Sequence, residues 1–293
     1  MILVTGAAGR AGTAVVKALA RRGEPVRALV RDPARAPWPA ELPGVTVVAG
    51  DLRDRATLGP ALDGVKRTLL ISSPREEMVD TQITFIDAAQ AAGVPHIVKF
   101  SGREAGVGFD QEVFRGTRWH GQVERYLERS GLVWTHLRPS QFMQNYLPGS
   151  ITGVDVAARE LVMPIGEAQL SPVDLADVAE IAAGVLTSGG HEKLAYDITG
   201  PEALTMTEIA ELISTATGDP FHYVAVTPEQ QRRRYAVAGV PPHVVDLFDE
   251  QFQERRRTPV ARVELAAHHV FGVTPTSFAT FARDHADEFA GRR

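Results

Sequence analysis

The chain has 293 residues, of which 44% are hydrophobic and 23% are charged, and its formal net charge is −5. This composition is typical of a globular protein of one large domain or two, and the acidic balance gives no support for a nucleic-acid partner or an anionic membrane surface. The sequence contains no cysteine, which excludes disulfides, thiolate catalysis and cysteine metal ligands.

The first segment predicts a strand, a glycine-rich turn and a helix. Residues 2–4 are a short apolar run without polar alternation, which is typical of a strand buried on both faces. From residue 13 apolar residues recur at helical spacing, and Gly23 follows as a helix stop. Glycines at three-residue spacing lie between this strand and this helix, and they let a diphosphate approach the amides at the start of the helix. The residues expected to form this dinucleotide site are Thr5, Gly6, Gly9, Arg10, Ala11 and Gly12. The alternative is a sterically required turn without a ligand.

Strands and helices then alternate as far as residue 139. Further strands are expected at 26–30, 45–51, 67–73, 96–102 and 133–139, and helices at 54–62, 78–93 and about 111–130. This alternation predicts parallel β-α-β crossovers and therefore an α/β fold with a doubly wound parallel sheet, of the Rossmann type.

Beyond residue 139 the alternation breaks. Strands are expected at 160–165 and 194–200, helices at 174–187 and 205–217, and a mostly helical tail at 228–288. These segments predict a smaller α/β C-terminal lobe. The chain is accordingly divided into a dinucleotide-binding domain, 1–150, and a substrate-binding lobe, 151–293, with some interleaving. The lobe is expected to cap the carboxyl ends of the strands, where ligands bind in open α/β sheets.

Several motifs together resemble the NmrA-like family, an atypical branch of the short-chain dehydrogenase/reductase superfamily. They include TGAAGRAG at 5–12, AGDL at 49–52, TFIDAAQAAGVPHIVKFSG at 84–102 and SPVDLADVAE at 171–180. The resemblance extends over the whole chain. It implies a Rossmann fold and either an NAD(P)H-dependent quinone or triphenylmethane dye reductase, or an NADP-binding regulator without turnover.

The choice between NADP(H) and NAD(H) is expected at the end of the second strand. Arg31 is the first residue past this strand, and a guanidinium can pair with a 2′-phosphate, which favours NADP(H) with help from Arg10. The alternative is an ordinary loop arginine at 31, with Asp32 binding the ribose of NAD(H).

Other nucleotide contacts follow from the resemblance and from the strand ends. By resemblance, Asp51 and Leu52 lie against the adenine, although Asp51 also suits a helix cap. Ser72, Ser101 and Pro139 stand at the ends of strands, where they are expected near the nicotinamide ribose or the substrate. Turn formation is the alternative for the serines.

The usual acid–base pair of short-chain dehydrogenases, Tyr-x-x-x-Lys, would fall at residues 116 and 120. Gly116 and His120 stand there instead. Some quinone-reducing relatives carry histidine at the lysine position, so His120 is the candidate catalytic residue, either as a proton donor or as a hydrogen-bond partner of the ribose. A structural role for this histidine is the alternative.

An apolar slot for a flat substrate is expected from Trp119, Phe142, Met143 and Tyr146, although such residues also form cores. His191, His268 and His269 have no evident ligand set, so no metal is assigned. The sequence therefore predicts an NADPH-dependent oxidoreductase that transfers a hydride to a quinone, dye-like or enone small molecule. The alternatives are an NADP(H)-sensing regulator and a biosynthetic ketoreductase or non-redox enzyme. A cytoplasmic location is expected, because no basic leader or membrane span is evident. The protein is expected to be a monomer or a homodimer.

Overall fold

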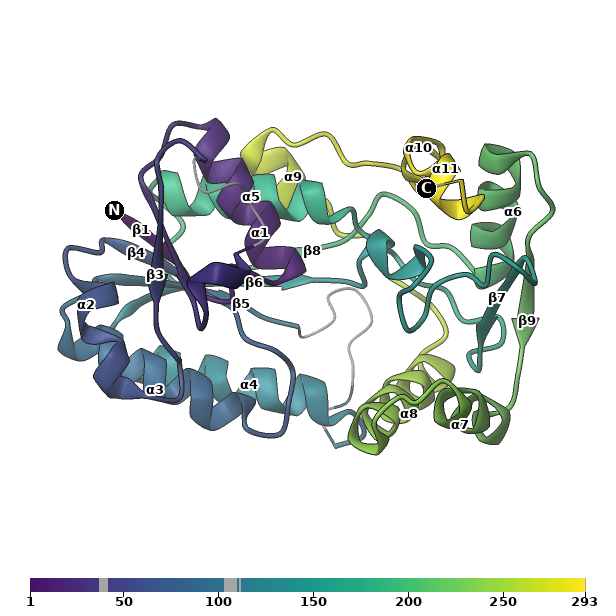
Figure 1. Cartoon of the computed structure of the whole chain (residues 1–293), viewed down its shortest axis with the longest axis horizontal. Helices are drawn as coiled ribbons and strands as arrows, with labels where there is room; N and C mark the ends of the chain where they lie inside the picture. Colours follow the sequence, from purple (N-terminus) through teal and green to yellow (C-terminus); the bar gives the residue numbers. More distant parts are fainter. Residues whose placement is uncertain (37–41, 103–109, 111, 293) are drawn as a thin grey trace.

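The computed structural model describes residues 1–36, 42–102, 110 and 112–292 (Figure 1). In this part of the chain the larger lobe contains a seven-stranded parallel sheet with the order β3-β2-β1-β4-β5-β6-β8. Its strands are β1 (Ile2–Val4), β2 (Val26–Val30), β3 (Val45–Ala49), β4 (Arg67–Leu70), β5 (His96–Phe100), β6 (Val133–Pro139) and β8 (Leu194–Ile198). The predicted doubly wound sheet is confirmed.

Helices cover both faces of this sheet (Figure 1). One face carries α1 (Arg10–Arg21), α5 (Leu175–Thr187) and α9 (Ala266–Phe271), and the other carries α2 (Gly59–Leu62), α3 (Met78–Ala91) and α4 (Arg115–Arg129). Successive residues of β1 pack on opposite faces of the sheet. Ile2 and Val4 belong to the core under α1 and α5, whereas Leu3 belongs to the core under α3. The unbroken apolar run at the start of the sequence follows from this burial on both sides.

The observed elements differ from the prediction mainly at their ends. Helix α1 begins at Arg10, because the chain enters the helix directly from the glycine turn. Strands β3, β4 and β5 each end two or three residues earlier than expected, where the chain leaves the sheet to form the ligand-side loops. Helix α4 begins at Arg115, and residue 111, its expected first residue, lies outside the described residues.

The assignment of residues 174–187 and 194–200 to the C-terminal lobe is wrong. β8 pairs with β6 in parallel, from Thr135 opposite Leu194 to Pro139 opposite Ile198, and α5 packs against α1. The two elements complete the main sheet and one of its helical layers. The sequence does not indicate that α5 and β8 belong to the larger lobe, because the segment between β6 and α5 interrupts the alternation of strands and helices.

The smaller lobe surrounds a second apolar core. It contains a parallel strand pair, β7 (Glu160–Met163) and β9 (His222–Ala225), of which β9 was not expected from the sequence. Its helices are α6 (Met206–Thr217), α7 (Pro228–Val237), α8 (Pro242–Arg257), α10 (Phe278–Asp284) and α11 (Ala286–Phe289). Capping boxes at Thr205 and Thr227 fix the starts of α6 and α7. Short 3₁₀ turns occur at Pro33–Arg35, Arg55–Thr57 and Met143–Tyr146.

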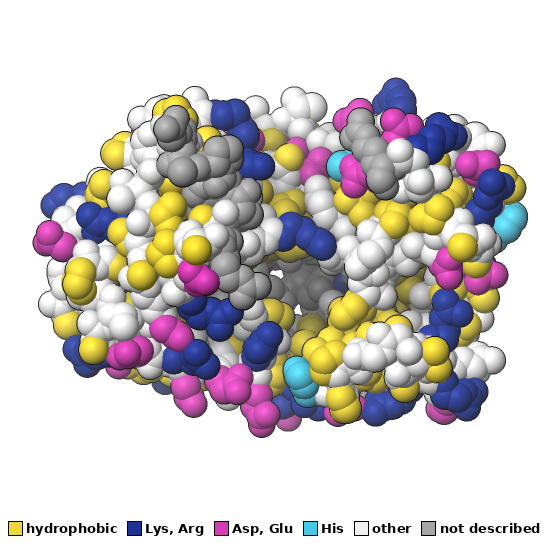
Figure 2. Space-filling view, viewed as in Figure 1, with side chains coloured by type: hydrophobic (Ala, Val, Ile, Leu, Met, Phe, Trp, Pro, Cys, Tyr) yellow, Lys and Arg dark blue, Asp and Glu magenta, His cyan; other side chains and the backbone are white. Residues whose placement is uncertain are grey.

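Helix α8 joins the two lobes at the start of α4. The carboxylate of Glu250 accepts hydrogen bonds from the backbone N of Arg115 at 3.0 Å and from its Nε at 2.7 Å. Figure 2 shows that the surface is hollowed between the lobes and that Lys and Arg side chains border this hollow. Among the described residues, none of the helices combines the length and the apolar character needed to cross a membrane.

Candidate functional site

The turn between β1 and α1 is closely packed. Gly6 has a positive φ of 56°, and a Cβ there would lie 2.9 Å from the carbonyl oxygen of Ile71. A Cβ on Gly12 would lie only 2.2 Å from the carbonyl oxygen of Gly6. The N-cap of α1 is Gly9, which provides no side-chain hydrogen bond to the helix, and no acidic residue lies in the first turn. The helix therefore presents its first amides and the positive end of its dipole to the space beyond the sheet.

A cavity of about 500 Å³ lies over this turn; we call it the turn cavity. This volume is in the range of small-molecule and cofactor sites. The predicted nucleotide residues that line it are Gly6, Gly9, Arg10, Ala11, Gly12, Arg31, Asp51, Leu52 and Ser72. The structure thus brings together residues from the ends of β1, β2, β3 and β4.

The turn cavity is also lined by Arg53 and Arg75, two arginines that the sequence analysis did not single out. Arg53 donates hydrogen bonds to both carboxylate oxygens of Asp51, the shortest of them 2.7 Å from Nη2 to Oδ2. This bonding, with a smaller contribution from the charge of Arg31, lowers the pKa of Asp51 to about 2. Asp51 is therefore ionised at neutral pH and holds Arg53 at the cavity wall.

Arg10 connects the glycine turn to the segment after β6. Its Nη1 donates to Oδ1 of Asn145 at 3.1 Å, and Nη2 reaches Oγ of Ser150 at 3.4 Å. Arg10 is still exposed and still lines the turn cavity.

Thr5 is not part of the described lining of the turn cavity. Its side chain is fully buried, and its hydroxyl donates to the carbonyl of Ile71 at 2.8 Å and accepts from the amide of Ile71 at 2.8 Å. The hydroxyl thus extends the pairing of β1 with β4 by one residue and fixes the position of Ile71, which does line the cavity.

A second cavity of about 310 Å³ lies beyond the ends of β5 and β6; we call it the strand-end cavity. It shares Ala11, Ile71 and Ser72 with the turn cavity, so the two are adjoining parts of one site. Of the predicted residues, it is lined by Ser101, His120, Pro139 and Phe142. Helix α8 adds Phe248 and Gln251 from the opposite side, residues whose helical spacing in the sequence gives no sign of this role.

Met143 and Tyr146 belong to the second core and not to a cavity wall. Both are almost completely buried, and the Tyr146 ring packs edge-on against Phe278 with the ring centroids 5.3 Å apart. Trp119 is absent from the described linings of both cavities. Of the four residues expected to form a flat slot, the structure places Phe142 alone at the strand-end cavity.

Lys99 is a further residue of this region that the sequence analysis missed. It lies in β5 with no solvent exposure, and its Nζ donates to the carbonyl of Phe100 at 2.9 Å and lies 3.0 Å from Nδ1 of His120. Burial lowers the pKa of Lys99 to about 7, although the charge of Glu124 acts in the opposite direction. A single lysine inside the apolar run of residues 96–100 was the available signal, because a lone buried cation is costly.

His120 is held as a neutral imidazole. Burial, and then the charge of Lys99, keep its pKa well below the ordinary value of 6.5. A Cβ on Gly102 would lie 2.8 Å from Nε2 of His120, so this glycine makes room for the ring. At the position of the usual tyrosine, a Cβ on Gly116 would lie 2.5 Å from Cζ of Phe114, whose ring occupies that space.

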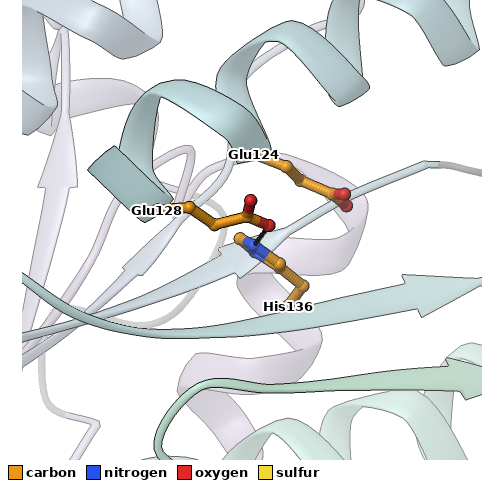
Figure 3. A group of neighbouring side chains, drawn as sticks. All are labelled: Glu124, Glu128 and His136. Atoms are coloured by element: carbon orange, nitrogen blue, oxygen red, sulfur yellow. Dashed lines mark hydrogen bonds and ion pairs between the residues drawn. The ribbon is translucent and has the colours of Figure 1, made fainter. Parts of the chain in front are cut away.

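Behind this pair, Glu124, Glu128 and His136 lie close together, with their ligand atoms within 4.8 Å of one another (Figure 3). Most of their polar atoms are engaged with neighbours, although Nδ1 of His136 is buried without a hydrogen-bond partner among the described residues. Both carboxylate oxygens of Glu124 accept from Arg138, at 3.0 and 2.7 Å, and Nε2 of His136 lies 3.1 Å from Glu128. A guanidinium in this position opposes a second cation, so the group is a partly buried network of charge pairs and we assign no metal to it.

Known proteins resemble this chain over nearly its whole length. The model of the NmrA-like family matches residues 1–265. The chain belongs to the NmrA-like family. The predicted family resemblance is confirmed.

Two characterised relatives of this NmrA-like chain are reductases by name. It is 37% identical over 289 residues to the NAD(P)H azoreductase of Xenophilus azovorans, with 99% of each chain covered. It is 30% identical over 251 residues to quinone oxidoreductase 2 of Escherichia coli strain K12, with 85% of each covered.

Solved structures of the family have the same fold. The crystal structure of the NADPH-dependent quinone oxidoreductase from Escherichia coli, complexed with NADPH, superposes with a TM-score of 0.84 at 26% identity and covers 97% of this chain and 99% of its own. The triphenylmethane reductase of Citrobacter sp., complexed with NADP(H), has a TM-score of 0.85 at 23% identity and covers 98% of this chain and 100% of its own.

Replacing Gly12 with alanine tests the packing of the NmrA-like turn. We expect Gly12→Ala to lower the free energy of unfolding by about 3 kcal/mol or more, because the new methyl group meets a backbone oxygen that cannot move independently. Chemical denaturation measures the change. Gly59→Ala is the control, since a Cβ at Gly59 meets nothing within 4 Å. Equal stability of the two variants would contradict the packing argument.

The buried amine predicts a pH-dependent stability. Between a folded pKa of about 7 and the ordinary value of 10.5, the folded chain binds fewer protons at Lys99 than the unfolded chain does, so wild-type stability rises with pH in this window. Lys99→Met removes that dependence. Its stability relative to wild type should fall by up to about 1.4 kcal/mol for each pH unit above 7.

Denaturant titrations at pH 7, 8 and 9 measure this difference. Lys66→Met is the matched control, because Lys66 is exposed and precedes the first residue of β4. Parallel pH profiles for wild type and Lys99→Met would show that the buried amine titrates normally.

Proposed function

We propose that this chain is an NADPH-dependent oxidoreductase that reduces a flat, electrophilic small molecule, such as a quinone or an azo or triphenylmethane dye, by hydride transfer. The observation that carries the proposal is the adjoining pair of cavities. One lies over a glycine turn and a helix N-terminus, and the other lies beside a neutral histidine.

The turn cavity fits a dinucleotide in shape and charge. The glycines leave the first amides of α1 accessible to a pyrophosphate, and any Cβ at Gly6 or Gly12 would close this cradle. Arg31 lines the cavity near Arg53, which Asp51 holds in place, so two guanidinium groups are available for a 2′-phosphate. The nicotinamide half would then extend past Ser72 toward Ser101 and Pro139.

The strand-end cavity fits an apolar, planar acceptor. The rings of Phe100 and Phe142 both line it, with centroids 6.2 Å apart, and Phe248 faces them from α8. Bound reduced nicotinamide supplies a hydride to such an acceptor. The chain contributes by holding the two partners in contact, by excluding water and by orienting the acceptor, which together can account for most of the rate.

His120 is the proposed catalytic residue. It lines the strand-end cavity, and its ring is neutral, so it can donate the proton on a ring nitrogen to an oxygen or nitrogen of the reduced acceptor. The pocket lacks the usual tyrosine, because Gly116 and the ring of Phe114 occupy its place. This arrangement suits acceptors whose reduced anions are stabilised by delocalisation.

The names of the relatives also support a reductase function. Those with whole-chain or near whole-chain similarity are named for azo and quinone reduction, and one homologous structure was solved with NADPH. A regulator that only senses the nucleotide would not require a polar histidine beside an aromatic acceptor cavity.

The reaction can be measured directly. We expect the protein to oxidise NADPH in the presence of menadione or a simple azo dye, followed as loss of absorbance of the reduced nucleotide. His120→Gln should reduce kcat about 10- to 100-fold, since general acid–base catalysis contributes at least this much in many enzymes. NADPH binding without oxidation by any acceptor of a broad quinone, dye and enone panel would contradict the proposed function and support a nucleotide sensor.

Arg31→Ala tests the nucleotide preference. Loss of a charge-assisted contact to the 2′-phosphate should weaken NADPH about 10- to 100-fold and leave NADH nearly unchanged. Dissociation constants from fluorescence titration measure both. Arg55→Ala is the control, because Arg55 is exposed and does not line the turn cavity in the described structure. Equal weakening of both nucleotides would remove the assignment of Arg31.

A further inference from the structure

Lys99 occupies a position that is unfavourable for an ammonium group. β5 is buried along its whole length between β4 and β6, and the Lys99 side chain has no solvent exposure. An apolar side chain of similar volume would avoid the loss of hydration that a buried amine suffers. The stability of the fold therefore does not account for the amine.

The contacts of this amine determine which nitrogen of His120 carries the proton. Lys99 Nζ is 3.0 Å from Nδ1 of His120, and a lysine ammonium has hydrogens to donate but no lone pair to accept with. While Lys99 is an ammonium, Nδ1 is therefore the acceptor, and the proton of the neutral ring is on Nε2. A Cβ on Gly102 would touch Nε2, and both Gly102 and His120 line the strand-end cavity. The donor end of the ring thus lies at the cavity wall.

We propose that Lys99 supplies, through His120, the proton that accompanies hydride transfer in the strand-end cavity. The inference rests on the proposed function and adds a positioning residue to it. A reduced nicotinamide dinucleotide gives a hydride, with two electrons, to one atom of a quinone or azo acceptor, and a negative charge develops on an acceptor oxygen or nitrogen.

Two side chains account for the proton that the acceptor takes up. The acceptor anion takes the proton from Nε2 of His120 while Nδ1 takes one from the Lys99 ammonium, so one N–H bond of the ring breaks as the other forms. The imidazole stays neutral, Lys99 is left as an amine and the nucleotide is oxidised. The acceptor gains the hydride and one further proton, which together amount to two electrons and two protons. A proton from water returns to Nε2, and the Nδ1 proton moves back to the amine.

The charged groups near Lys99 are compatible with this relay. Glu124 on α4 acts on the pKa of Lys99 and is paired with Arg138, which also lies 3.9 Å from Asp197 of β8. His136 stands opposite Lys99 on β6 and is paired with Glu128. Burial alone would raise the pKa of Glu124, but the hydrogen bonds from Arg138 and nearby positive charge bring it to about 2, and burial lowers the pKa of His136. Lys99, with a pKa of about 7, is the described group of this cluster whose charge is expected to change near neutral pH. A pKa close to the working pH is the most effective for proton donation.

The first test uses the protein without nucleotide or acceptor. The chain has four lysines, and Lys17, Lys66 and Lys193 are exposed, so lysine labelled with ¹³C and ¹⁵N at the end of its side chain should give one unusual NMR signal. We expect that signal to titrate near pH 7. In ¹⁵N-histidine spectra, assigned with His120→Gln, the ring of His120 should carry its proton on Nε2 in the wild type and lose this preference in Lys99→Met.

The second test is the pH profile of turnover. In the wild type, kcat with an azo dye should fall as pH rises through about 7, because the ammonium loses its proton. Lys99→Met should abolish this decline and lower kcat at pH 6 about 100-fold, with unchanged affinity for NADPH. The loss should be smaller with a quinone, whose reduced anion is a weaker base. Lys66→Met should match the wild type.

The outcomes separate this inference from the proposed function. If no acceptor is reduced, the proposed function fails, while the titration of Lys99 and the tautomer of His120 still test the pairing of the two residues. A Lys99 signal that titrates near 10.5, a His120 ring protonated on Nδ1, or a Lys99→Met variant that keeps the wild-type pH profile would each overturn the relay.

Discussion

The close approach of the first helix to the turn before it is the constraint on which the site depends. Gly12 lies so near the carbonyl of Gly6 that no side chain fits between them, and Thr5 fixes Ile71 of the neighbouring strand end through two hydrogen bonds. Together these contacts determine where the amides of α1 point. The turn cavity and the strand-end cavity share Ala11, Ile71 and Ser72, so both are positioned by the same few atoms.

The chemistry of the second half of the site depends on a different physical effect, the exclusion of water from the sheet. Lys99 lies on a strand with neighbours on both sides and helix α4 over it, and its shifted pKa follows from that burial. The same burial keeps His120 neutral. In the proposed mechanism, the pair of Lys99 and His120 takes the place of the usual tyrosine, and the charge of the buried lysine contributes to the lowered pKa of the histidine.

Much of the fold and of the nucleotide site was predictable because both depend on local patterns. Short apolar runs, glycine spacing and the residue following each strand are read directly from the chain, and most of the residues so identified line the turn cavity.

The errors have a common origin in long-range packing. Met143 and Tyr146 have the right chemistry for a substrate slot, yet their orientation is decided by helices more than a hundred residues later, including the one that carries Phe278. Thr5 stands in a nucleotide-binding motif, but the partner of its hydroxyl is Ile71, which follows the end of another strand. Lys99 was missed because its importance becomes clear only when the contact with His120 is known.

The path of the chain between the lobes has a mechanical consequence. The backbone leaves the sheet after β6 to form β7, returns for α5 and β8, departs again for α6 to α8, comes back with α9 and ends in the other lobe with α10 and α11. Two bodies joined by one flexible linker can rotate as rigid pieces about a hinge, whereas several separate covalent connections restrain that rotation in most directions. Access to the strand-end cavity would therefore depend on local displacement of side chains and loops and not on wide opening of the molecule. Under the proposed function, this restraint would favour thin aromatic acceptors over bulky, three-dimensional ones.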